Sequence, residues 1–228
     1  MQRSALTQSG RTTQGVVRVG DTIRRPMGPN APFVHSLLQH LAWRDFHAAP
    51  RFLGVDELGR EILSYLDGEV PSDLGDFSTP VVRTAARLLR DFHDATADSG
   101  LCDPGEVVCH GDPSPCNAVF RRGVPYAWID FDAARPGLRR HDVGYAAWLW
   151  LDIGNADWPP SRQGTRLRDF VLHYGELPIR DAVTSILDAQ IELSARPGAP
   201  RGVQAWAAEC HRWTTSHQGS LEEAVAGS

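Results

Sequence analysis

The sequence predicts an α+β fold in which a small β-rich part precedes a larger helical part. Short apolar segments separated by turn residues fill much of the chain before residue 67. Beyond residue 140, apolar residues recur with a helical period in four successive segments. A stretch with glycine and proline at 67–71 lies between the two patterns. We therefore expect two lobes, an N-terminal lobe of residues 1–66 and a C-terminal lobe of residues 67–228.

The composition is that of an ordinary soluble globular protein. Of the 228 residues, 42% are hydrophobic and 22% are charged, so the chain is long and apolar enough to bury a real core. The net charge of -5 offers no basic face to nucleic acid. No apolar run approaches the roughly 20 residues of a membrane span, and the N-terminus lacks the apolar core of a signal peptide. We expect a cytoplasmic protein that binds neither nucleic acid nor membrane.

The first predicted elements are two strands and a helix. Residues 15–19 and 22–25 have strand character, and Gly20-Asp21 between them is a turn signal. Residues 32–41 carry apolar side chains at helical spacing, which predicts a helix.

A second hairpin and a longer helix follow. Residues 51–55 and 60–66 are predicted strands, joined by a turn that contains a glycine. A helix is expected from Ser78 to His93, because a capping residue and a first-turn proline precede an apolar face.

The middle of the chain reads as short strands and the last third as helices. Residues 107–109 form an apolar strand, and 118–120 and 126–129 form a hairpin around a glycine turn. Helices are then predicted over 141–151, 161–174, 178–195 and 202–215.

A group of polar residues follows the strand at 107–109. Asp112 and Asn117 lie on one loop, and Asp130 comes where the later hairpin ends. Phosphoryl transfer needs a carboxylate to take a hydroxyl proton and hard oxygen ligands to hold Mg²⁺ on the nucleotide phosphates. Amide and carboxylate oxygens are ligands of that kind. The pattern therefore indicates phosphoryl transfer.

This stretch resembles the catalytic core of the aminoglycoside phosphotransferase and choline kinase-like family of small-molecule kinases. The family's H-G-D-x-x-x-x-N element matches His110, Gly111, Asp112 and Asn117. Its I-D-[FW] and D-[IVL]-[AG] elements match residues 129–131 and 142–144, in the right order. The resemblance implies a two-lobed protein-kinase-like fold with a reduced β-rich N-lobe and a helical C-lobe. The matched elements span about forty residues, with weaker similarity over most of the chain.

The resemblance also implies roles for these residues. Asp112 would be the general base, or would at least orient the acceptor hydroxyl, and His110 would support its loop by hydrogen bonding. Asn117 and Asp130 would hold Mg²⁺, with Asp132 as a weaker candidate at the metal.

Two further polar residues are expected to be structural. Asp142 lies near the start of a helix, where an acid is consistent with a cap, and in the family it braces the catalytic loop. His93 ends the preceding long helix, where family members carry a histidine without a chemical role.

The nucleotide contacts implied by the resemblance begin with a covering loop at residues 8–13. The chain has no lysine, so the phosphate-binding lysine of the family would be replaced by Arg24, whose planar guanidinium keeps the charge. Arg25 would point to the opposite face, because strand side chains alternate. Adenine would meet the backbone of the interlobe hinge at Ser64, Tyr65 and Leu66.

One departure from the family pattern concerns the N-lobe helix. The family often has a glutamate near the start of this helix, which pairs with the strand lysine. Here the equivalent residue is Val34 or His35, so the ion pair is absent or rebuilt from other residues.

The most direct interpretation is an ATP-dependent phosphotransferase that acts on a hydroxyl group of a small molecule, such as an aminoglycoside-like antibiotic or a related metabolite. ATP and Mg²⁺ are the implied cofactors, and the nucleotide and the hydroxyl acceptor are the implied partners. A cationic acceptor would suit the negative net charge. Candidate acids for it are Asp152, Asp157, Glu176, Glu192 and Glu209, although each one singly fits a solvated helix face equally well.

Two other classes stay open on sequence grounds. One is a catalytically weak or inactive kinase-like protein that sequesters a ligand, as a resistance or immunity factor does. The other is a zinc-stabilised module using Cys109, His110 and Cys116, which the missing C-x-x-C spacing disfavours.

Overall fold

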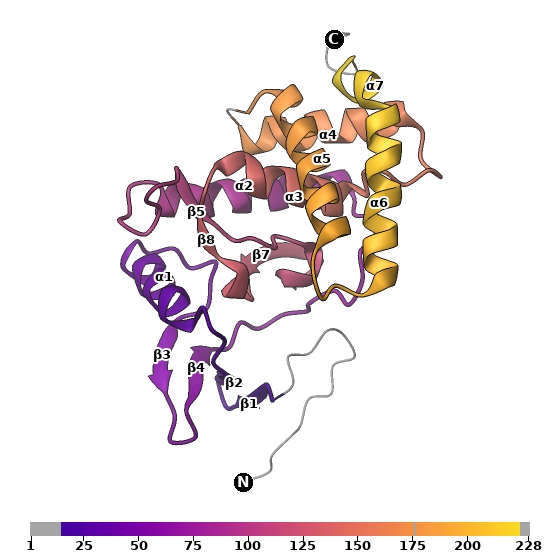
Figure 1. Ribbon diagram of the computed structural model, residues 1–228. Helices are drawn as coiled ribbons and strands as arrows, with labels where there is room; N and C mark the ends of the chain where they lie inside the picture. The colour runs from indigo at the N-terminus through magenta and orange to yellow at the C-terminus, as the bar shows by residue number, and fades with distance from the viewer. Residues whose placement is uncertain (1–14, 176, 224–228) are drawn as a thin grey trace.

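The computed structural model describes residues 15–175 and 177–223 (Figure 1). A small antiparallel sheet with one helix forms the N-lobe, drawn at the lower left in indigo and purple. The helices of the C-lobe fill the upper right. The α+β class expected from the sequence is therefore confirmed.

The N-lobe sheet has four antiparallel strands in the order β1-β2-β4-β3. They are β1 (Val17–Val19), β2 (Thr22–Pro26), β3 (Phe52–Val55) and β4 (Arg60–Ser64). Helix α1 (Ala31–Trp43) packs beside β3 and buries Val34, Leu37, Leu38 and Leu41, the apolar side chains that predicted it. In the register of β2 and β4, Arg25 lies opposite Glu61 and Arg24 lies opposite Ile62.

The connection from the N-lobe to the C-lobe runs alongside a strand of the C-lobe. The backbone of Glu69 pairs with that of Phe120, with N–H to O distances of 2.9 and 2.7 Å. Gly68 has φ +155°, and a side chain there would collide with the Phe120 carbonyl. The chain then enters α2 (Thr79–Thr96), whose apolar face is buried. Ser78 occupies the N-cap position, but its side chain makes no capping hydrogen bond.

Two short strand pairs carry the loops of interest. They are β5 (Val107–Cys109) with β8 (Arg135–Gly137), and β6 (Ala118–Arg121) with β7 (Val124–Trp128). A 3₁₀ turn, η1 (Pro115–Asn117), precedes β6, and a second one, η2 (Phe131–Ala133), precedes β8. The strand β8 was not predicted from the sequence. Because it pairs with β5, it draws the segment after Asp130 back against the segment before His110.

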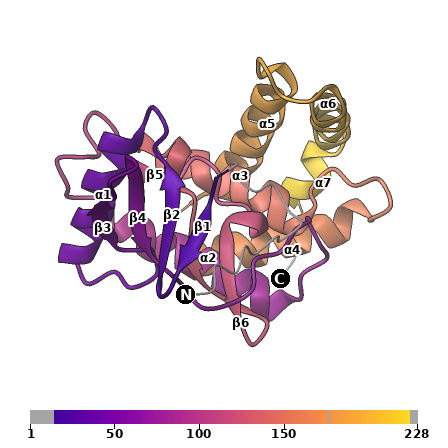
Figure 2. The ribbon, with the colours of Figure 1, turned by 90° about the horizontal axis from the view of Figure 1, so that it is seen from below.

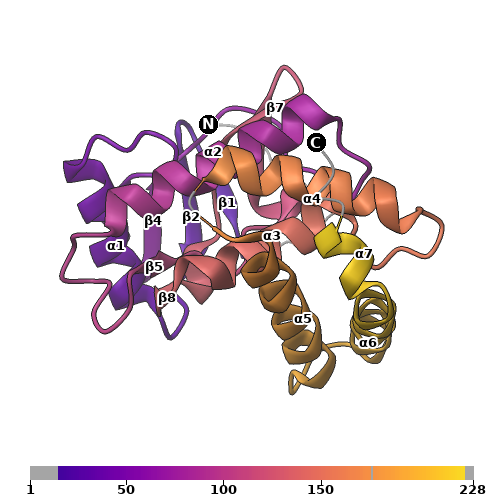
Figure 3. The same cartoon turned by 90° about the horizontal axis from the view of Figure 1, so that it is seen from above.

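The remaining chain is helical, as the apolar periodicity indicated. The elements are α3 (Arg139–Leu151), α4 (Pro160–Tyr174), α5 (Ile179–Ala195), α6 (Arg201–Ser216) and the unpredicted α7 (Gln218–Glu223). Seen from below, α5 and α6 lie on the side of the molecule away from the sheet (Figure 2). Seen from above, α2 and α4 run side by side across the C-lobe (Figure 3). No described helix combines the length and apolarity that crossing a membrane requires.

Candidate active site

The loop after β5 is held by the segment that carries Asp130. His110 is fully buried, and its ring lies among Phe92, Trp128 and Phe131. Its Nε2 lies 3.0 Å from the Ile129 carbonyl oxygen, and its Nδ1 lies 3.3 Å from the backbone nitrogen of Asp112. The second contact requires an acceptor, so Nδ1 is unprotonated and Nε2–H donates to Ile129. His110 thus supports the loop by hydrogen bonding.

Gly111 brings the two loops into direct contact. Its φ is +82°, and a Cβ at this position would overlap the backbone carbonyl of Ala133. Only glycine combines this conformation with so close an approach. The loop that carries Asp112 and the turn that follows Asp130 are therefore fixed relative to one another.

Asp142 anchors the same loop from α3. Its carboxylate accepts the backbone N–H of His110 at 2.6 Å and that of Gly111 at 3.0 Å. Nε2 of His93 lies 3.1 Å from the same carboxylate, and His93 Nδ1 lies 2.8 Å from the Tyr174 hydroxyl. Asp142 therefore braces the loop, and this use of its carboxylate replaces the helix cap considered from the sequence. His93 is part of that brace, as its structural interpretation required.

Burial acts on the two central ionisable groups of this region in different ways. Burial lowers the pKa of His110 below its ordinary 6.5, in agreement with the neutral tautomer that its hydrogen bonds require. Burial alone would raise the pKa of Asp142, but hydrogen bonds from His93 and the loop backbone outweigh it, so that pKa lies below 3.8. Asp142 is thus ionised, and the His110 imidazole on the loop that it braces is neutral.

Asp112 and Asn117 face one another across the loop. The Asn117 Nδ2 donates to the Asp112 carbonyl oxygen at 2.9 Å, which leaves Asn117 Oδ1 without a partner among the described residues. The Trp150 indole donates to the Pro113 carbonyl at 3.0 Å from within the core. The side chain of Asp112 itself is half-buried and makes no hydrogen bond within the described chain.

Asp130 has an uncommon backbone conformation. It precedes η2 with φ 64° and ψ 62°, in the left-handed region that non-glycine residues rarely adopt. The side chain of Asp130 is 42% exposed and that of Asp132 is 49% exposed. A strained residue whose carboxylate faces solvent is typical of a functional position.

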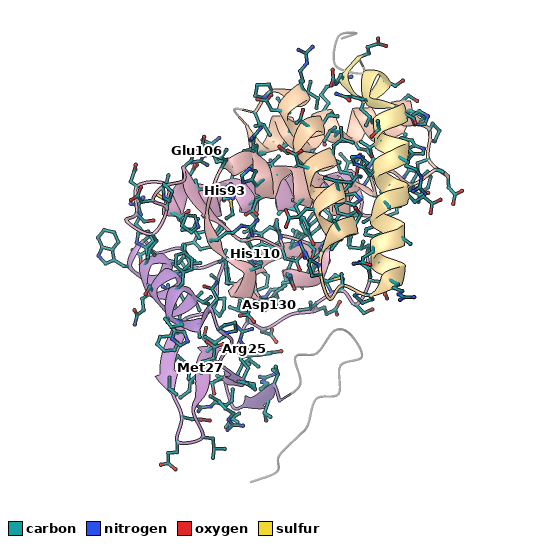
Figure 4. The ribbon with its side chains drawn as sticks, in the orientation of Figure 1. Arg25, Met27, His93, Glu106, His110 and Asp130 are labelled. Carbon is teal, nitrogen blue, oxygen red and sulfur yellow. The ribbon has the colours of Figure 1, made fainter. Side chains whose placement is uncertain are left out.

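Arg25, and not Arg24, is the arginine on this face of the sheet. Its Nη1 lies 3.0 Å from Asp130 Oδ1, and its Nη2 lies 2.5 Å from Asp132 Oδ1 (Figure 4). Arg24 is its neighbour on a strand and points to the other face. The expectation that Arg24 lies on this face of the sheet and Arg25 on the opposite one was therefore wrong by one residue.

The third nitrogen of Arg25 contacts a residue that the sequence did not single out. Its Nε donates to Glu61 Oε1 at 2.5 Å, and Glu61 Oε2 lies 2.8 Å from His35 Nε2. Glu61 is 1% exposed. The ion pair expected from the N-lobe helix is thus rebuilt with an acid from β4, and His35 of α1 contacts that acid. An acid directly before the apolar pair Ile62 and Leu63 of a predicted strand is the signal that could have identified Glu61.

The predicted hinge residues differ in how many of their backbone groups are free to hydrogen-bond with a ligand. The amide of Ser64 donates to Arg51 and that of Tyr65 donates to Asp21, both at 2.9 Å. The Leu66 backbone makes no hydrogen bond with any residue that the structure describes. Of the three, Leu66 is the residue whose backbone N–H and carbonyl both lack a partner among the described residues, and the Tyr65 carbonyl lacks one as well. The predicted covering loop at 8–13 lies outside the described residues.

The candidate acceptor acids do not form one cluster in the structure. Asp152 ends α3 and binds the Asn155 side chain at 2.6 Å, while Glu192 pairs with Arg196 on the exposed face of α5. Asp157 and Glu209 are exposed, and Glu176 lies outside the described residues. Among the described residues, no group of three or more His, Cys, Asp or Glu side chains has a metal-binding arrangement.

The side chains expected to hold the metal nevertheless have the chemistry that suits Mg²⁺. Asp130 and Asp132 supply carboxylates, and Asn117 supplies an amide oxygen with no partner in the described chain. These are hard oxygen ligands of the kind that Mg²⁺ prefers. Three carboxylates meet one guanidinium here, so the group carries excess negative charge.

No family model matches the chain. A trifolitoxin immunity protein from Rhizobium leguminosarum bv. trifolii is 28% identical to it, over 97% of this chain and 98% of that protein. Among solved structures, an ethanolamine kinase from Plasmodium vivax has a TM-score of 0.64 with 13% identity, over 87% of this chain and 77% of that one. A spectinomycin phosphotransferase bound to ADP and spectinomycin has a TM-score of 0.56 with 11% identity, over 92% of both chains.

Other structural neighbours are choline/ethanolamine kinases and aminoglycoside phosphotransferases. They share the small antiparallel N-lobe and helical C-lobe that the sequence motifs implied. The chain therefore has the protein-kinase-like fold of the choline/ethanolamine kinases and aminoglycoside phosphotransferases.

Proposed function

We propose that this protein is an ATP-dependent phosphotransferase acting on a hydroxyl group of a small molecule. The observation that carries the proposal is the fixed placement of two loops. Asp112 and Asn117 lie on one, Asp130 lies on the other, and Gly111 presses the first against the second. A carboxylate, an amide oxygen and a second carboxylate held in one place are what this reaction needs. The fold of the neighbouring small-molecule kinases supports the same conclusion.

Each residue has a defined task in this proposal. Asp112 accepts the proton of the acceptor hydroxyl as that oxygen attacks the γ-phosphorus of ATP, while the bond from that phosphorus to the bridging oxygen breaks and ADP leaves. Asn117 and Asp130 would hold Mg²⁺, and Arg25 would contact the phosphates from the N-lobe. Bound Mg²⁺ would neutralise charge on the transferring phosphoryl group. The backbone of Leu66 contacts adenine.

The test is the substitution Asp112→Asn, which keeps the shape and removes the base. Turnover should fall by about 10²-fold or more, the usual scale for losing a general base. The loss should lie mainly in kcat, because the contact matters most as the hydroxyl attacks. Mg·ATP affinity, measured by calorimetry, should stay nearly unchanged. Equal turnover of wild type and variant across a panel of hydroxylated compounds would refute the assignment of Asp112.

The second candidate is a kinase-like protein that protects its host by binding a toxic ligand without phosphorylating it. The full-length similarity to an immunity protein favours it. So does the pairing of Arg25 with both Asp130 and Asp132, which occupies the acids proposed for the metal.

The two candidates differ in what Asp112→Asn does to a cell challenged with the toxic ligand. A phosphotransferase loses protection with this variant, whereas a binder keeps it because no proton is moved. Full protection by the Asp112→Asn protein, with no phosphorylated product from the wild type, would establish the binder.

A further inference from the structure

We infer that Glu61, steadied by His35, is the positioning acid that holds the Arg25 guanidinium toward Asp130 and Asp132. The inference rests on the proposed function in one respect, since it makes Arg25 the phosphate contact. It assigns to a strand glutamate and a helix histidine the task that the resemblance gives to a helix glutamate.

The geometry leaves Arg25 little freedom. Its three guanidinium nitrogens meet three carboxylates: Nε donates to Glu61, Nη2 donates to Asp132, and Nη1 donates to Asp130 and also lies 3.3 Å from Asp132 Oδ2. Its side chain is 10% exposed. Because Nε is fixed on the N-lobe side, the two Nη groups must point toward the C-lobe acids, where the phosphates would lie.

Glu61 is itself held on both sides. It lies opposite Arg25 in the β2–β4 ladder, so the two side chains emerge on the same face. Its second oxygen meets His35, whose ring stacks on Phe52 with centroids 3.8 Å apart. The carboxylate is therefore unable to rotate away from Arg25 without losing the His35 bond.

This arrangement accounts for an arginine where related kinases use a lysine. A lysine ammonium has three N–H donors, but all of them are on one nitrogen, so it could not span carboxylates that are placed around three separate guanidinium nitrogens. A guanidinium presents three nitrogens in a rigid plane. A second set of hydrogen bonds joins the N-lobe to the segment that carries Asp130 and Asp132. The Asn30 side chain, at the start of α1, donates to the carbonyls of Asp132 and Ala134 at 3.1 and 2.9 Å.

The direct test reads the Arg25 Nε–H in nitrogen-15 spectra of the full chain, assigned by its loss in Arg25→Lys. Glu61→Gln should shift this signal and speed its exchange with water, because the charged acceptor is gone. Glu57→Gln is the matched control, since Glu57 is exposed on the turn of the same hairpin. An unchanged Nε–H signal in folded Glu61→Gln protein would overturn the inference.

Two variants of His35 give an independent measure if Glu61→Gln fails to fold. His35→Ala removes the second tie on Glu61 and should broaden or shift the Nε–H signal. His35→Gln keeps a side-chain N–H donor and should restore it. The matched control is His40→Gln on the same helix, because His40 Nε2 lies against the Ala95 carbonyl instead. A signal indifferent to His35→Ala would also overturn the inference.

Calorimetry with Mg·ATP separates positioning from a purely structural role. Losing a charge-assisted bond of this kind should weaken Mg·ATP by about tenfold in Glu61→Gln. In an Arg25→Ala background the same substitution should add nothing, because Glu61 acts through Arg25. Additive losses would indicate a structural role and contradict the inference. A wild type that binds no Mg·ATP would refute the proposed function, while the Nε–H signal would still decide the positioning.

Discussion

Asp142 and Arg25 organise the two halves of the site in opposite ways. At Asp142, one anion receives N–H groups from His110, Gly111 and His93. At Arg25, one cation donates to three anions. Each is a three-partner cluster around a single ion, but the signs are reversed.

The two clusters differ in burial and in charge balance. Asp142 is 2% exposed and its partners are backbone amides and an imidazole, so its hydrogen bonds are satisfied within the protein. Around Arg25, two of the three acids are nearly half exposed, and one positive charge faces three negative ones. The buried Asp142 cluster leaves no group free to bind a ligand, because its partners all lie within the protein. The Arg25 cluster keeps excess negative charge on two partly exposed carboxylates, which would attract a further cation.

The largest expected effect is on folding, from Asp142→Asn. The amide would turn an N–H group toward backbone N–H donors and leave buried groups unpaired. Unfolding in urea, followed by circular dichroism, should show a loss of about 3–5 kcal/mol. The control is Asp188→Asn on the exposed side of α5, which should change stability by less than about 0.5 kcal/mol. Equal stability of the two variants would show that Asp142 contributes no more to folding than an exposed surface acid.

A smaller loss of stability, about 2 kcal/mol, is expected for Arg25→Ala. Glu61 keeps its contact with His35, and the half-exposed Asp130 and Asp132 regain water. Added Mg²⁺ should recover part of this loss, because binding to the folded state is stabilising. Arg24→Ala, on the opposite face, should stay within about 0.5 kcal/mol of wild type. If added Mg²⁺ stabilised Asp142→Asn as much as Arg25→Ala, the effect of Mg²⁺ would not be specific to the Arg25 cluster.

The pH dependence of stability should come from His110 on the braced loop and not from the Arg25 cluster. The pKa of His110 is lowered from 6.5, so below that pH the unfolded chain gains a proton that the folded chain does not. The stability present above pH 6.5 is therefore lost as pH falls toward the folded pKa, by at most about 1.4 kcal/mol per pH unit. Urea unfolding in steps from neutral pH to about pH 5 measures it. His110→Gln should flatten this slope, and an unaltered slope would assign it elsewhere.

The smallest effect is expected for Asp132→Asn, within about 0.5 kcal/mol of wild-type stability. The side chain is nearly half exposed, and Asp130 and Glu61 still balance Arg25. Urea unfolding in parallel with Asp142→Asn provides the measurement. A loss approaching that of Asp142→Asn would mean that the Arg25 cluster is a structural cluster like the brace.

Much of the fold was predictable because its signals are local. The helical period of α1 and the glycine turn between β6 and β7 lie within short stretches of sequence. The strand β8 was missed because Arg135, Pro136 and Gly137 have no strand propensity of their own. They form a strand only because β5 provides a partner.

The site residues that belong to one sequence motif were predictable, whereas those that meet only through strand pairing were not. His110, Asp112, Asn117 and Asp130 follow a linear pattern, and the structure brings their loops together. Glu61 was missed because it is 36 residues from Arg25, and only strand pairing joins them. Choosing between Arg24 and Arg25 required the register of a five-residue strand with charged residues on both faces. A shift of one residue exchanges the faces completely.

The guanidinium of Arg25 also decides how this protein responds to reactive chemistry. Probes that acylate an amine near a nucleotide phosphate label kinases through the uncharged amine of a lysine. A guanidinium stays protonated in proteins and resists acylation, and this chain contains no lysine at all. A survey of nucleotide-binding proteins by lysine-directed labelling would therefore pass over it, even with its site fully occupied.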